Sequence, residues 1–326
     1  MARANIHPPG RRSHPRRGVL PGPPPSVRMG ERHGRRHEGR TVGLETYWAT
    51  DPSEVLRVRQ GFRLEDVDTR GTPGFEGNKS AAEGSLAEGA AILADLQEKL
   101  FAGNQMGDDP RRLLLVLQAM DTAGKGGIVK HVMSAVDPQG VQVATFKKPT
   151  DEELEHDFLW RISKEVPDAG MIGVFDRSHY EDVLIAKVRE LAPPKEIERR
   201  YDAINEFEAE LAASGTTIIK VMLHISSDEQ KERLTDRLER PDKHWKFNPG
   251  DIEERMLAPK YQEAYQVVFD RTTTPHAPWY VIPADRKWYA RLAVQHLLID
   301  ALEAMNLSWP AADYDVAEQQ ARLAAD

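Results

Sequence analysis

The chain has 326 residues, with 44 Lys and Arg against 52 Asp and Glu, and it contains no cysteine. This length can bury one sizeable α/β core or two small ones, and the missing cysteine excludes disulfides, thiolate metal sites and a cysteine nucleophile. The longest apolar runs are far below the roughly 18 residues that cross a bilayer, so we expect a cytoplasmic protein without a membrane segment.

The first 40 residues differ from the rest of the chain in charge and composition. They contain ten Arg, seven Pro and six Gly but only two acids, so they carry a charge of +8 while the remaining residues carry −16. Such a segment has too few apolar side chains to offset the entropy of ordering, and we predict that residues 1–40 form a disordered tail. A transit peptide, a nucleic-acid-binding arm and sequence upstream of a start at Met29 are the alternatives.

Residues 41–110 form an N-terminal extension in which no pattern predicts chemistry. Within it, apolar residues recur every three or four positions over residues 81–101, which indicates an amphipathic helix. The apolar positions are Leu86, Ala90, Leu93, Leu96 and Leu100.

Residues 111–305 alternate between continuous apolar runs and helical patterns. Such runs are typical of strands covered on both faces, and their alternation with helices predicts an α/β fold with a parallel sheet flanked by helices. We expect the first helix to reach Val136, an acidic helix over residues 151–166, and a last helix over residues 287–305. Residues 306–326 form a C-terminal tail without a role in chemistry. The predicted strands cover residues 113–117, 141–145, 171–175, 217–225 and 279–282.

The most specific motif lies where the first predicted strand gives way to the first helix. Backbone N–H groups of such a turn favour a phosphate chain, and Lys125 adds a positive charge. Compared with the pattern Gly-x4-Gly-Lys-Ser/Thr, Ala119 replaces the first glycine and Gly126 replaces the hydroxyl that binds magnesium. Asp121 inside a phosphate site requires a divalent cation between the negative charges, which indicates Mg²⁺. The residues expected around the phosphates are Ala123, Gly124, Lys125, Gly126 and Gly127.

A second motif ends the third predicted strand. Asp176 follows an apolar run, as in the second metal-binding strand of phosphate-loop proteins, where an Asp holds Mg²⁺ directly or through water. Arg177 next to it can neutralise a transferred phosphoryl group. We therefore expect both residues at the catalytic site.

A third motif follows the fourth predicted strand, where basic residues recur on one side of a helix. Arg233, Arg237 and Arg240 are spaced four and three apart, and Lys243 and Lys246 follow them. On a body with a charge of −16, this stripe predicts a track for an anion.

Each motif also has a purely structural interpretation. The first motif can be a glycine-containing turn with an exposed lysine. In the second, Asp176 or Ser178 can cap a helix over residues 180–190. The third can be a solvated helix with Glu-Arg pairs, because acids such as Glu229 stand one turn from the arginines.

The three motifs read QAMDTAGKGG at residues 118–127, FDRSHYEDVL at 175–184 and RPDKHWKF at 240–247. In this order and spacing they closely resemble the polyphosphate kinase 2 family, over about residues 75–305. The resemblance implies a P-loop kinase fold with a helical lid over about residues 226–257. It also implies Mg²⁺-dependent, reversible transfer of a terminal phosphoryl group between inorganic polyphosphate and a nucleotide, and a homo-oligomer.

The same resemblance, carried over motif by motif, implies roles for single residues. Asp121 and Lys125 fall in the first phosphate loop, and Asp176 and Arg177 fall in the second. Asp121 and Asp176 would hold Mg²⁺, or Mn²⁺ in its place. The His-Tyr-Glu-Asp continuation resembles the branch that accepts nucleoside mono- and diphosphates, so we expect ADP, AMP and ATP as substrates, with GDP and GMP as further candidates. The lid residues implied are Arg233, Arg237, Lys243 and Lys246.

Two other functions compete with this one. An ATP-dependent kinase for a nucleotide or small molecule would use the same loop, and it predicts activity with ATP but none with polyphosphate. A non-catalytic P-loop scaffold predicts nucleic-acid binding through residues 1–40 that does not depend on Lys125; apart from it we expect no nucleic-acid partner. The chain contains neither Gly-x-Gly-x-x-Gly nor Gly-x-Ser-x-Gly, so we expect neither dinucleotide nor serine-hydrolase chemistry.

Overall fold

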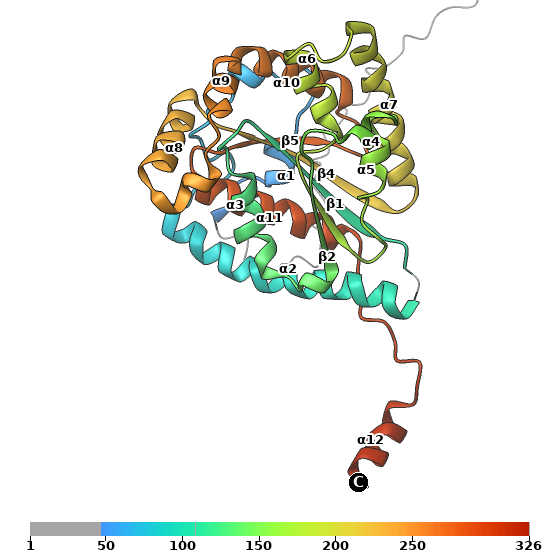
Figure 1. The fold of residues 1–326 in the computed structure, drawn as a ribbon. Helices are drawn as coiled ribbons and strands as arrows, with labels where there is room; N and C mark the ends of the chain where they lie inside the picture. The colour runs from blue at the N-terminus through green and yellow to red at the C-terminus, as the bar shows by residue number, and fades with distance from the viewer. Residues whose placement is uncertain (1–46, 108, 326) are drawn as a thin grey trace, which may run out of the picture. The chain divides into compact units, whose positions relative to one another are not determined.

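The computed structural model describes residues 47–107 and 109–325, so the tail predicted for residues 1–40 lies outside the described residues. The described chain is built around a five-stranded parallel sheet with the strand order β2-β3-β1-β4-β5 (Figure 1). This confirms the predicted α/β fold, and each strand lies where an apolar run predicted it. The strands are β1 (Arg112–Ala119), β2 (Val141–Thr145), β3 (Ile172–Asp176), β4 (Thr216–His224) and β5 (Trp279–Pro283).

Helices of very different length connect and cover the strands. The α-helices are α1 (Pro52–Val55), α2 (Lys79–Gly107), α3 (Lys125–His131), α4 (Asp151–Leu154), α5 (Trp160–Ser163), α6 (Ile185–Val188), α7 (Pro194–Ala213), α8 (Ser227–Glu239), α9 (Gly250–Met256), α10 (Ala258–Thr272), α11 (Lys287–Ala304) and α12 (Val316–Ala324). Short 3₁₀ helices are η2 (Leu64–Asp66), η3 (Met133–Ala135), η4 (Pro138–Gly140), η5 (His179–Asp182) and η6 (Pro241–Lys246).

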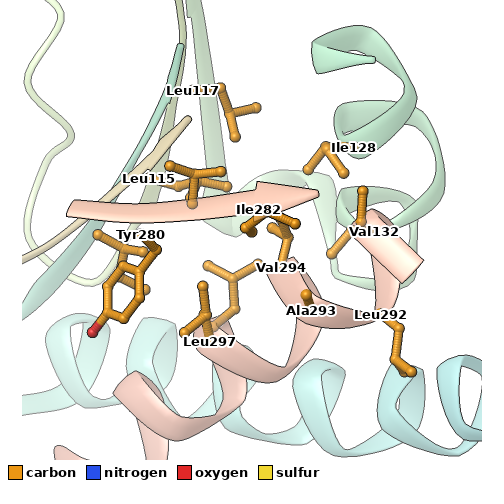
Figure 2. Close-up of a cluster of buried hydrophobic side chains, with 14 of the residues drawn as sticks. Leu115, Leu117, Ile128, Val132, Tyr280, Ile282, Leu292, Ala293, Val294 and Leu297 are labelled. Atoms are coloured by element: carbon orange, nitrogen blue, oxygen red, sulfur yellow. The ribbon is translucent and has the colours of Figure 1, made fainter. Parts of the chain in front are cut away.

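The two faces of the sheet pack into different hydrophobic cores. On one face, Leu115 and Leu117 of β1 pack with residues of α3 and α11, such as Val294 (Figure 2). On the other face, Leu114 and Val116 belong to a core that includes residues of α7 and α10. Because successive strand side chains point to opposite faces, one continuous apolar strand fills both cores.

The segment before β1 packs against this sheet as well. Leu93 and Leu100 of α2 lie in the first core, where α2 contacts α11. Nearer the N-terminus, the Val58 N–H donates to the carbonyl oxygen of Trp279 at 2.9 Å, beside an antiparallel bridge between Arg57 and Tyr280. Residues 47–107 therefore cover the free edge of β5 and contribute to both cores, since Val58 and Leu64 belong to the second.

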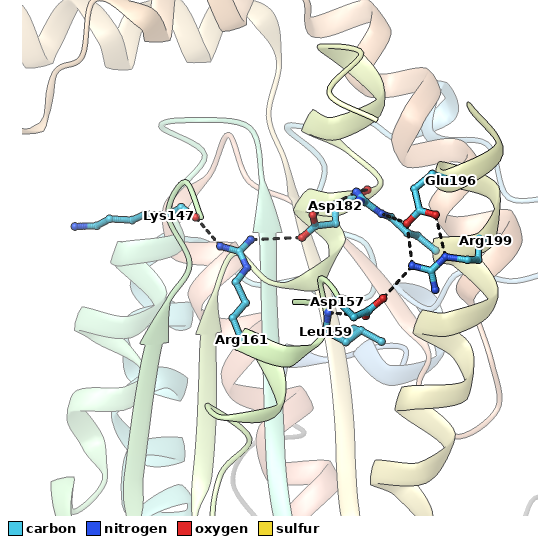
Figure 3. A network of polar contacts seen from close by, with 8 residues as sticks. Lys147, Asp157, Leu159, Arg161, Asp182, Glu196 and Arg199 are labelled. Atoms are coloured by element: carbon cyan, nitrogen blue, oxygen red, sulfur yellow. Dashed lines mark hydrogen bonds and ion pairs between the residues drawn. The ribbon is translucent and has the colours of Figure 1, made fainter. Parts of the chain in front are cut away.

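The acidic helix predicted over residues 151–166 is wrong: the structure has two short helices, α4 and α5. The break occurs at Asp157, whose carboxylate accepts a hydrogen bond from the Leu159 N–H at 3.1 Å and so begins a new turn. The same carboxylate binds Arg199 of α7 at 3.0 Å (Figure 3). Contacts with α7 therefore determine the local structure here more than helix propensity does.

Three other helix boundaries differ from the prediction. Residues 180–190 form η5 and α6, because Ser178, His179 and Tyr180 are all buried, whereas a surface α-helix buries only one side. Helix α3 ends at His131 rather than Val136, since its two glycines and β-branched residues are weak helix formers. Helix α2 is longer than the predicted 81–101.

Candidate active site

The turn from β1 into α3 carries the first motif. Gly124 has a φ of +124°, a conformation that glycine adopts without the steric cost of a side chain. Helix α3 begins at Lys125, whose Nζ donates to the carbonyl oxygen of Ala119 at 3.1 Å. Burial lowers the pKa of Lys125, while the charges of Asp121 and Asp176 oppose that shift. The turn therefore presents one buried amine next to two carboxylates.

The turn after β3 lies beside the first and carries the second motif. Leu117 of β1 pairs with Asp176 in the sheet, and the Arg177 N–H donates to the Leu117 carbonyl oxygen at 3.0 Å. Arg177 has a φ of +64°, which is rare for a residue with a side chain, and its Nη2 donates to Oδ1 of Asp121 at 3.0 Å. Burial acts to lower the pKa of Arg177, but attraction to Glu181 and Asp121 outweighs it and leaves the pKa above its ordinary value.

An open cleft of about 610 Å³ contains both turns. All twelve residues predicted at the site line it, although they come from three separate stretches of the chain. Ten Lys and Arg side chains line the cleft against three Asp side chains, so its charge is opposite to that of the body that carries it. The predicted residues are Asp121, Ala123, Gly124, Lys125, Gly126, Gly127, Asp176, Arg177, Arg233, Arg237, Lys243 and Lys246.

Four further basic residues of the cleft were missed by the sequence analysis. Lys130 lies in α3 and Lys147 follows β2, while Lys287 and Arg291 lie one turn apart at the start of α11. Burial lowers the pKa of both α11 residues. A signal was available, because β5 is parallel to β1 and β3, so the residues that follow it lie at the same edge of the sheet.

Arg233 lines the cleft, but its guanidinium is already hydrogen-bonded to other atoms of the protein. Its side chain is buried, and the five N–H groups of its guanidinium are matched by five acceptors. In this conformation it holds the phosphate loop against the turn that follows β5, and its contact with phosphate stays a prediction. The acceptors are Oε1 of Glu229 at 2.7 Å and the carbonyl oxygens of Thr122 at 3.0 Å, Ala123 at 2.8 Å, Ala284 at 2.6 Å and Asp285 at 3.1 Å.

The segment predicted as a lid comprises α8, η6 and α9. Arg237 of α8 donates to the carbonyl oxygen of Lys246 at 3.0 Å and to Oδ2 of Asp251 at 3.1 Å. Lys243 forms an ion pair with Asp236. These contacts tie the three helices of the lid to one another, and they leave the Lys246 ammonium on the cleft.

The prediction that Arg240 shares a helix face with the other two arginines is wrong. Helix α8 ends at Glu239, and Arg240 follows it in an extended conformation before Pro241. Its guanidinium binds Asp242 at 2.8 Å and does not line the cleft.

A smaller pocket of about 290 Å³ shares Asp121 and Arg177 with the cleft but has the opposite charge. Five of its side chains are acids, against two arginines, and Tyr261 and Tyr265 add aromatic surface. Burial raises the pKa of Glu181, and the charge of Arg177 opposes that shift. The acids are Asp121, Glu181, Asp251, Glu253 and Glu254.

The residues predicted to hold a metal ion fit a hard cation. Asp121 and Asp176 provide carboxylate oxygens on neighbouring turns of one cleft, and Mg²⁺ prefers one or two carboxylates together with water and substrate phosphates. Within residues 47–107 and 109–325, the Asp176 carboxylate accepts no hydrogen bond, whereas Asp121 already binds Arg177. The pair thus retains oxygens that can act as ligands.

Over the described part of the chain, no helix combines the length and the hydropathy that a bilayer-spanning segment needs.

Residues 77–310 match a family model described as Polyphosphate kinase 2. The matched range includes both phosphate-site turns, the lid and the start of α11.

The chain is also similar to individual proteins over most of its length. It is 47% identical over 249 residues to the AMP/ADP-polyphosphate phosphotransferase of Meiothermus ruber, which covers 76% of this chain and 91% of the relative. It is 43% identical over 272 residues to the ADP-polyphosphate phosphotransferase of Rhodopseudomonas palustris, covering 79% and 92%. The crystal structure of a polyphosphate kinase 2 from Arthrobacter aurescens TC1 aligns with a TM-score of 0.84 and 59% identity, over 86% of this chain and 98% of that chain.

Proposed function

The chain belongs to the polyphosphate kinase 2 family, and from this premise we propose how its two pockets transfer a phosphoryl group between inorganic polyphosphate and a nucleotide. The enzyme is a polyphosphate:nucleotide phosphotransferase. The names of the similar proteins reported above support this activity rather than an ATP-dependent kinase or a nucleic-acid-binding scaffold.

The observation that carries the proposal is the charge of the cleft. Ten basic side chains converge on it, from the phosphate loop, the turn after β3, the lid and α11, while the body as a whole is acidic. A chain of phosphates carries about one negative charge per unit, so a long, open, basic cleft attracts it and aligns it. We place polyphosphate here, with Lys130, Lys147, Lys287 and Arg291 extending the track beyond the phosphate loop.

The acceptor nucleotide is assigned to the smaller, acidic pocket. Its carboxylates repel a polyanionic chain, but they can accept hydrogen bonds from ribose hydroxyls and base amino groups. Tyr261 and Tyr265, which are 8% and 2% exposed, form part of the pocket wall and offer a base a small apolar contact. Because Asp121 and Arg177 line both pockets, the terminal phosphate of the nucleotide and the end of the polyphosphate chain meet at this pair.

Transfer at this pair needs little proton chemistry. A terminal phosphate with a second pKa near 6 is already largely ionised at neutral pH, so one of its oxygens can attack without a general base. The bond between the terminal phosphorus and the bridging oxygen of polyphosphate breaks as the new bond forms, and the chain leaves one unit shorter. Lys125 and Arg177 stabilise the charge of this loose transition state, and closure of the lid would exclude water.

Mg²⁺ belongs to this proposal as the ion held by Asp121 and Asp176, and Mn²⁺ can replace it. When bound, such an ion neutralises phosphate oxygens and orients them for in-line transfer. The reaction is therefore expected to stop when EDTA removes the divalent cation.

A cytoplasmic location and assembly into a homo-oligomer are also proposed, since the nucleotide substrates are cytoplasmic metabolites and the family resemblance implies oligomers. Sedimentation of the purified chain tests the assembly, and fractionation of cells that express it tests the location.

The experiment that tests the function supplies the purified protein with polyphosphate, Mg²⁺ and either ADP or AMP, and measures the ATP and ADP formed. The account predicts products that require polyphosphate, and the acceptor that works identifies the subclass. A control without polyphosphate excludes disproportionation of ADP. Turnover of ATP with another acceptor, and none with polyphosphate, would show that the donor was assigned wrongly.

A further inference from the structure

A fully buried polar network follows the turn that carries Arg177. Glu208 of α7 accepts a hydrogen bond from Tyr180 Oη at 2.8 Å and contacts Nε2 of His179 at 3.2 Å. Lys220 of β4 donates to Oε2 of Glu208 at 2.6 Å, to Tyr180 Oη at 2.8 Å and to the Thr272 carbonyl oxygen at 2.7 Å. Each of these four charged or aromatic side chains is at most 1% exposed. The network joins η5, α7, β4 and α10 through hydrogen bonds.

Packing alone does not account for this network. It lies inside the second hydrophobic core, where two apolar side chains of the same volume stabilise a fold as well as a buried ion pair does. Burial acts to raise the pKa of Glu208, but the charge of Lys220 outweighs it and leaves the pKa below its ordinary value. Burial also lowers the pKa of Lys220, and the charge of Glu208 opposes that shift. Any displacement of Tyr180 would leave a buried donor or acceptor without its partner.

Arg177 is the nearby residue whose conformation needs such support. Its positive φ is strained for a residue with a side chain and persists only where the surroundings fix it. Three residues later, Tyr180 is fixed by the network, and its N–H is held by Oγ of Ser178 at 3.2 Å. The other end of η5 is held by an ion pair between Asp182 and Arg161 at 3.4 Å (Figure 3). The turn is thus fixed from two directions.

We propose that Lys220, Glu208 and Tyr180 form a positioning network for Arg177, which holds the turn after β3 so that the guanidinium meets the transferred phosphoryl group. The three side chains do not line the cleft, so they act through Arg177 rather than on the substrate. This inference rests on the proposed function, because it requires Arg177 to act in the transition state. A misplaced transition-state group lowers kcat and leaves KM nearly unchanged.

The test is a double-mutant cycle that combines Tyr180→Phe with Arg177→Ala. Tyr180→Phe removes only the hydroxyl, which donates to Glu208 and accepts from Lys220. The matched control is Tyr289→Phe, which removes a buried tyrosine hydroxyl from the first core, where it donates to the Pro73 carbonyl oxygen at 2.7 Å. The kcat and both KM values are measured for each variant by luminescent detection of ATP.

We expect Tyr180→Phe to lower kcat by about fivefold or more while both KM values stay within about twofold. In the Arg177→Ala background the same change should have no further effect, since the group that it positions is gone. Tyr289→Phe should keep the wild-type kcat. An unchanged kcat in Tyr180→Phe, or an equal loss in both backgrounds, would overturn the inference.

A second variant covers the case in which Tyr180→Phe folds poorly. Glu208→Gln combined with Lys220→Met removes both charges and keeps similar volumes, so its melting temperature should stay near that of the wild type while its kcat falls only when Arg177 is present. If Arg177→Ala alone leaves kcat unchanged, the proposed role of Arg177 fails together with this inference. If Arg177→Ala is strongly impaired while both network variants keep their kcat, only the positioning network is wrong.

Discussion

The cleft and the smaller pocket share Asp121 and Arg177 but have no other lining residue in common. The cleft has ten basic side chains against three acids, and the pocket has five acids against two arginines. Both substrates of the proposed reaction are anions, so attraction alone cannot sort them. The difference between the two regions indicates that repulsion by carboxylates keeps the longer polyanion on the side where the lysines gather.

The shared pair marks the border between the two regions. Nη2 of Arg177 and Oδ1 of Asp121 lie 3.0 Å apart, and each side chain reaches both spaces. The comparison therefore predicts large losses of rate at the border and in the phosphate loop. For residues that line only the cleft or only the smaller pocket, it predicts smaller effects, each specific for one of the two substrates.

The largest effect is expected at Lys125 in the basic cleft. Lys125→Ala should lower kcat/KM by about a hundredfold or more, because it removes a preorganised charge from the transferred phosphoryl group. The melting temperature should stay near that of the wild type, and Lys260→Ala, an exposed lysine on α10, serves as the control that keeps full activity. Retention of the wild-type rate would remove Lys125 from the site.

The next effect is expected at the border. Arg177→Lys keeps the positive charge but loses the planar fork that can contact Asp121 and phosphate together, so kcat should fall about tenfold with little change in either KM. Steady-state rates with polyphosphate and ADP measure this effect. A kcat near that of the wild type would make Arg177 a structural residue.

A moderate effect is expected in the acidic pocket. Glu181→Gln should admit polyphosphate to the nucleotide side, so that polyphosphate competes with ADP with an inhibition constant about fivefold lower than in the wild type. Initial rates at rising polyphosphate concentration reveal this competition. If competition in the variant matches the wild type, carboxylate repulsion does not sort the substrates.

The pH dependence of the same competition follows from the pKa of Glu181. Because burial raises this pKa against the opposing charge of Arg177, the carboxylate becomes neutral at a pH where an ordinary glutamate is still charged. Competition by polyphosphate in the wild type should therefore grow as the pH falls toward the raised pKa. In Glu181→Gln it should stay constant over that range, and a parallel rise in both proteins would point to a different group.

The smallest effect is expected in the lid. Lys243 lines the cleft and Arg240 does not, although Arg240 directly precedes η6 and Lys243 lies within it. Lys243→Ala should raise the KM for polyphosphate about threefold at low ionic strength, and salt should diminish the difference. Arg240→Ala should match the wild type, and an equal effect of both changes would mean that only the overall charge of the lid matters.

The strands and the phosphate loop were predictable from sequence because their causes are local. A continuous apolar run such as that of β1 is buried on both faces, and Gly124 marks a backbone conformation that few other residues adopt. The three motifs lie in separate stretches, and the parallel sheet brings them to one edge. Their convergence in one cleft therefore followed from the fold class.

Some residues were not predicted, or have a role or local structure that differs from the prediction. Their place in the structure depends on tertiary contacts. Arg233 has the spacing of a phosphate ligand, but four of its five acceptors are backbone oxygens outside α8, and no sequence pattern reveals them. Helix 151–166 breaks where Asp157 turns toward α7. Lys287 and Arg291 belong to the site only because β5 lies beside β4 in the sheet.

The most direct test of the sorting of substrates by charge is the double variant Lys287→Ala with Arg291→Ala. These residues lie in the basic cleft, on α11, and do not line the acidic pocket. The account predicts that the KM for polyphosphate rises about tenfold or more while the KM for ADP stays within about twofold, with a weaker dependence on salt than in the wild type. A rise in the KM for ADP at an unchanged KM for polyphosphate would contradict it.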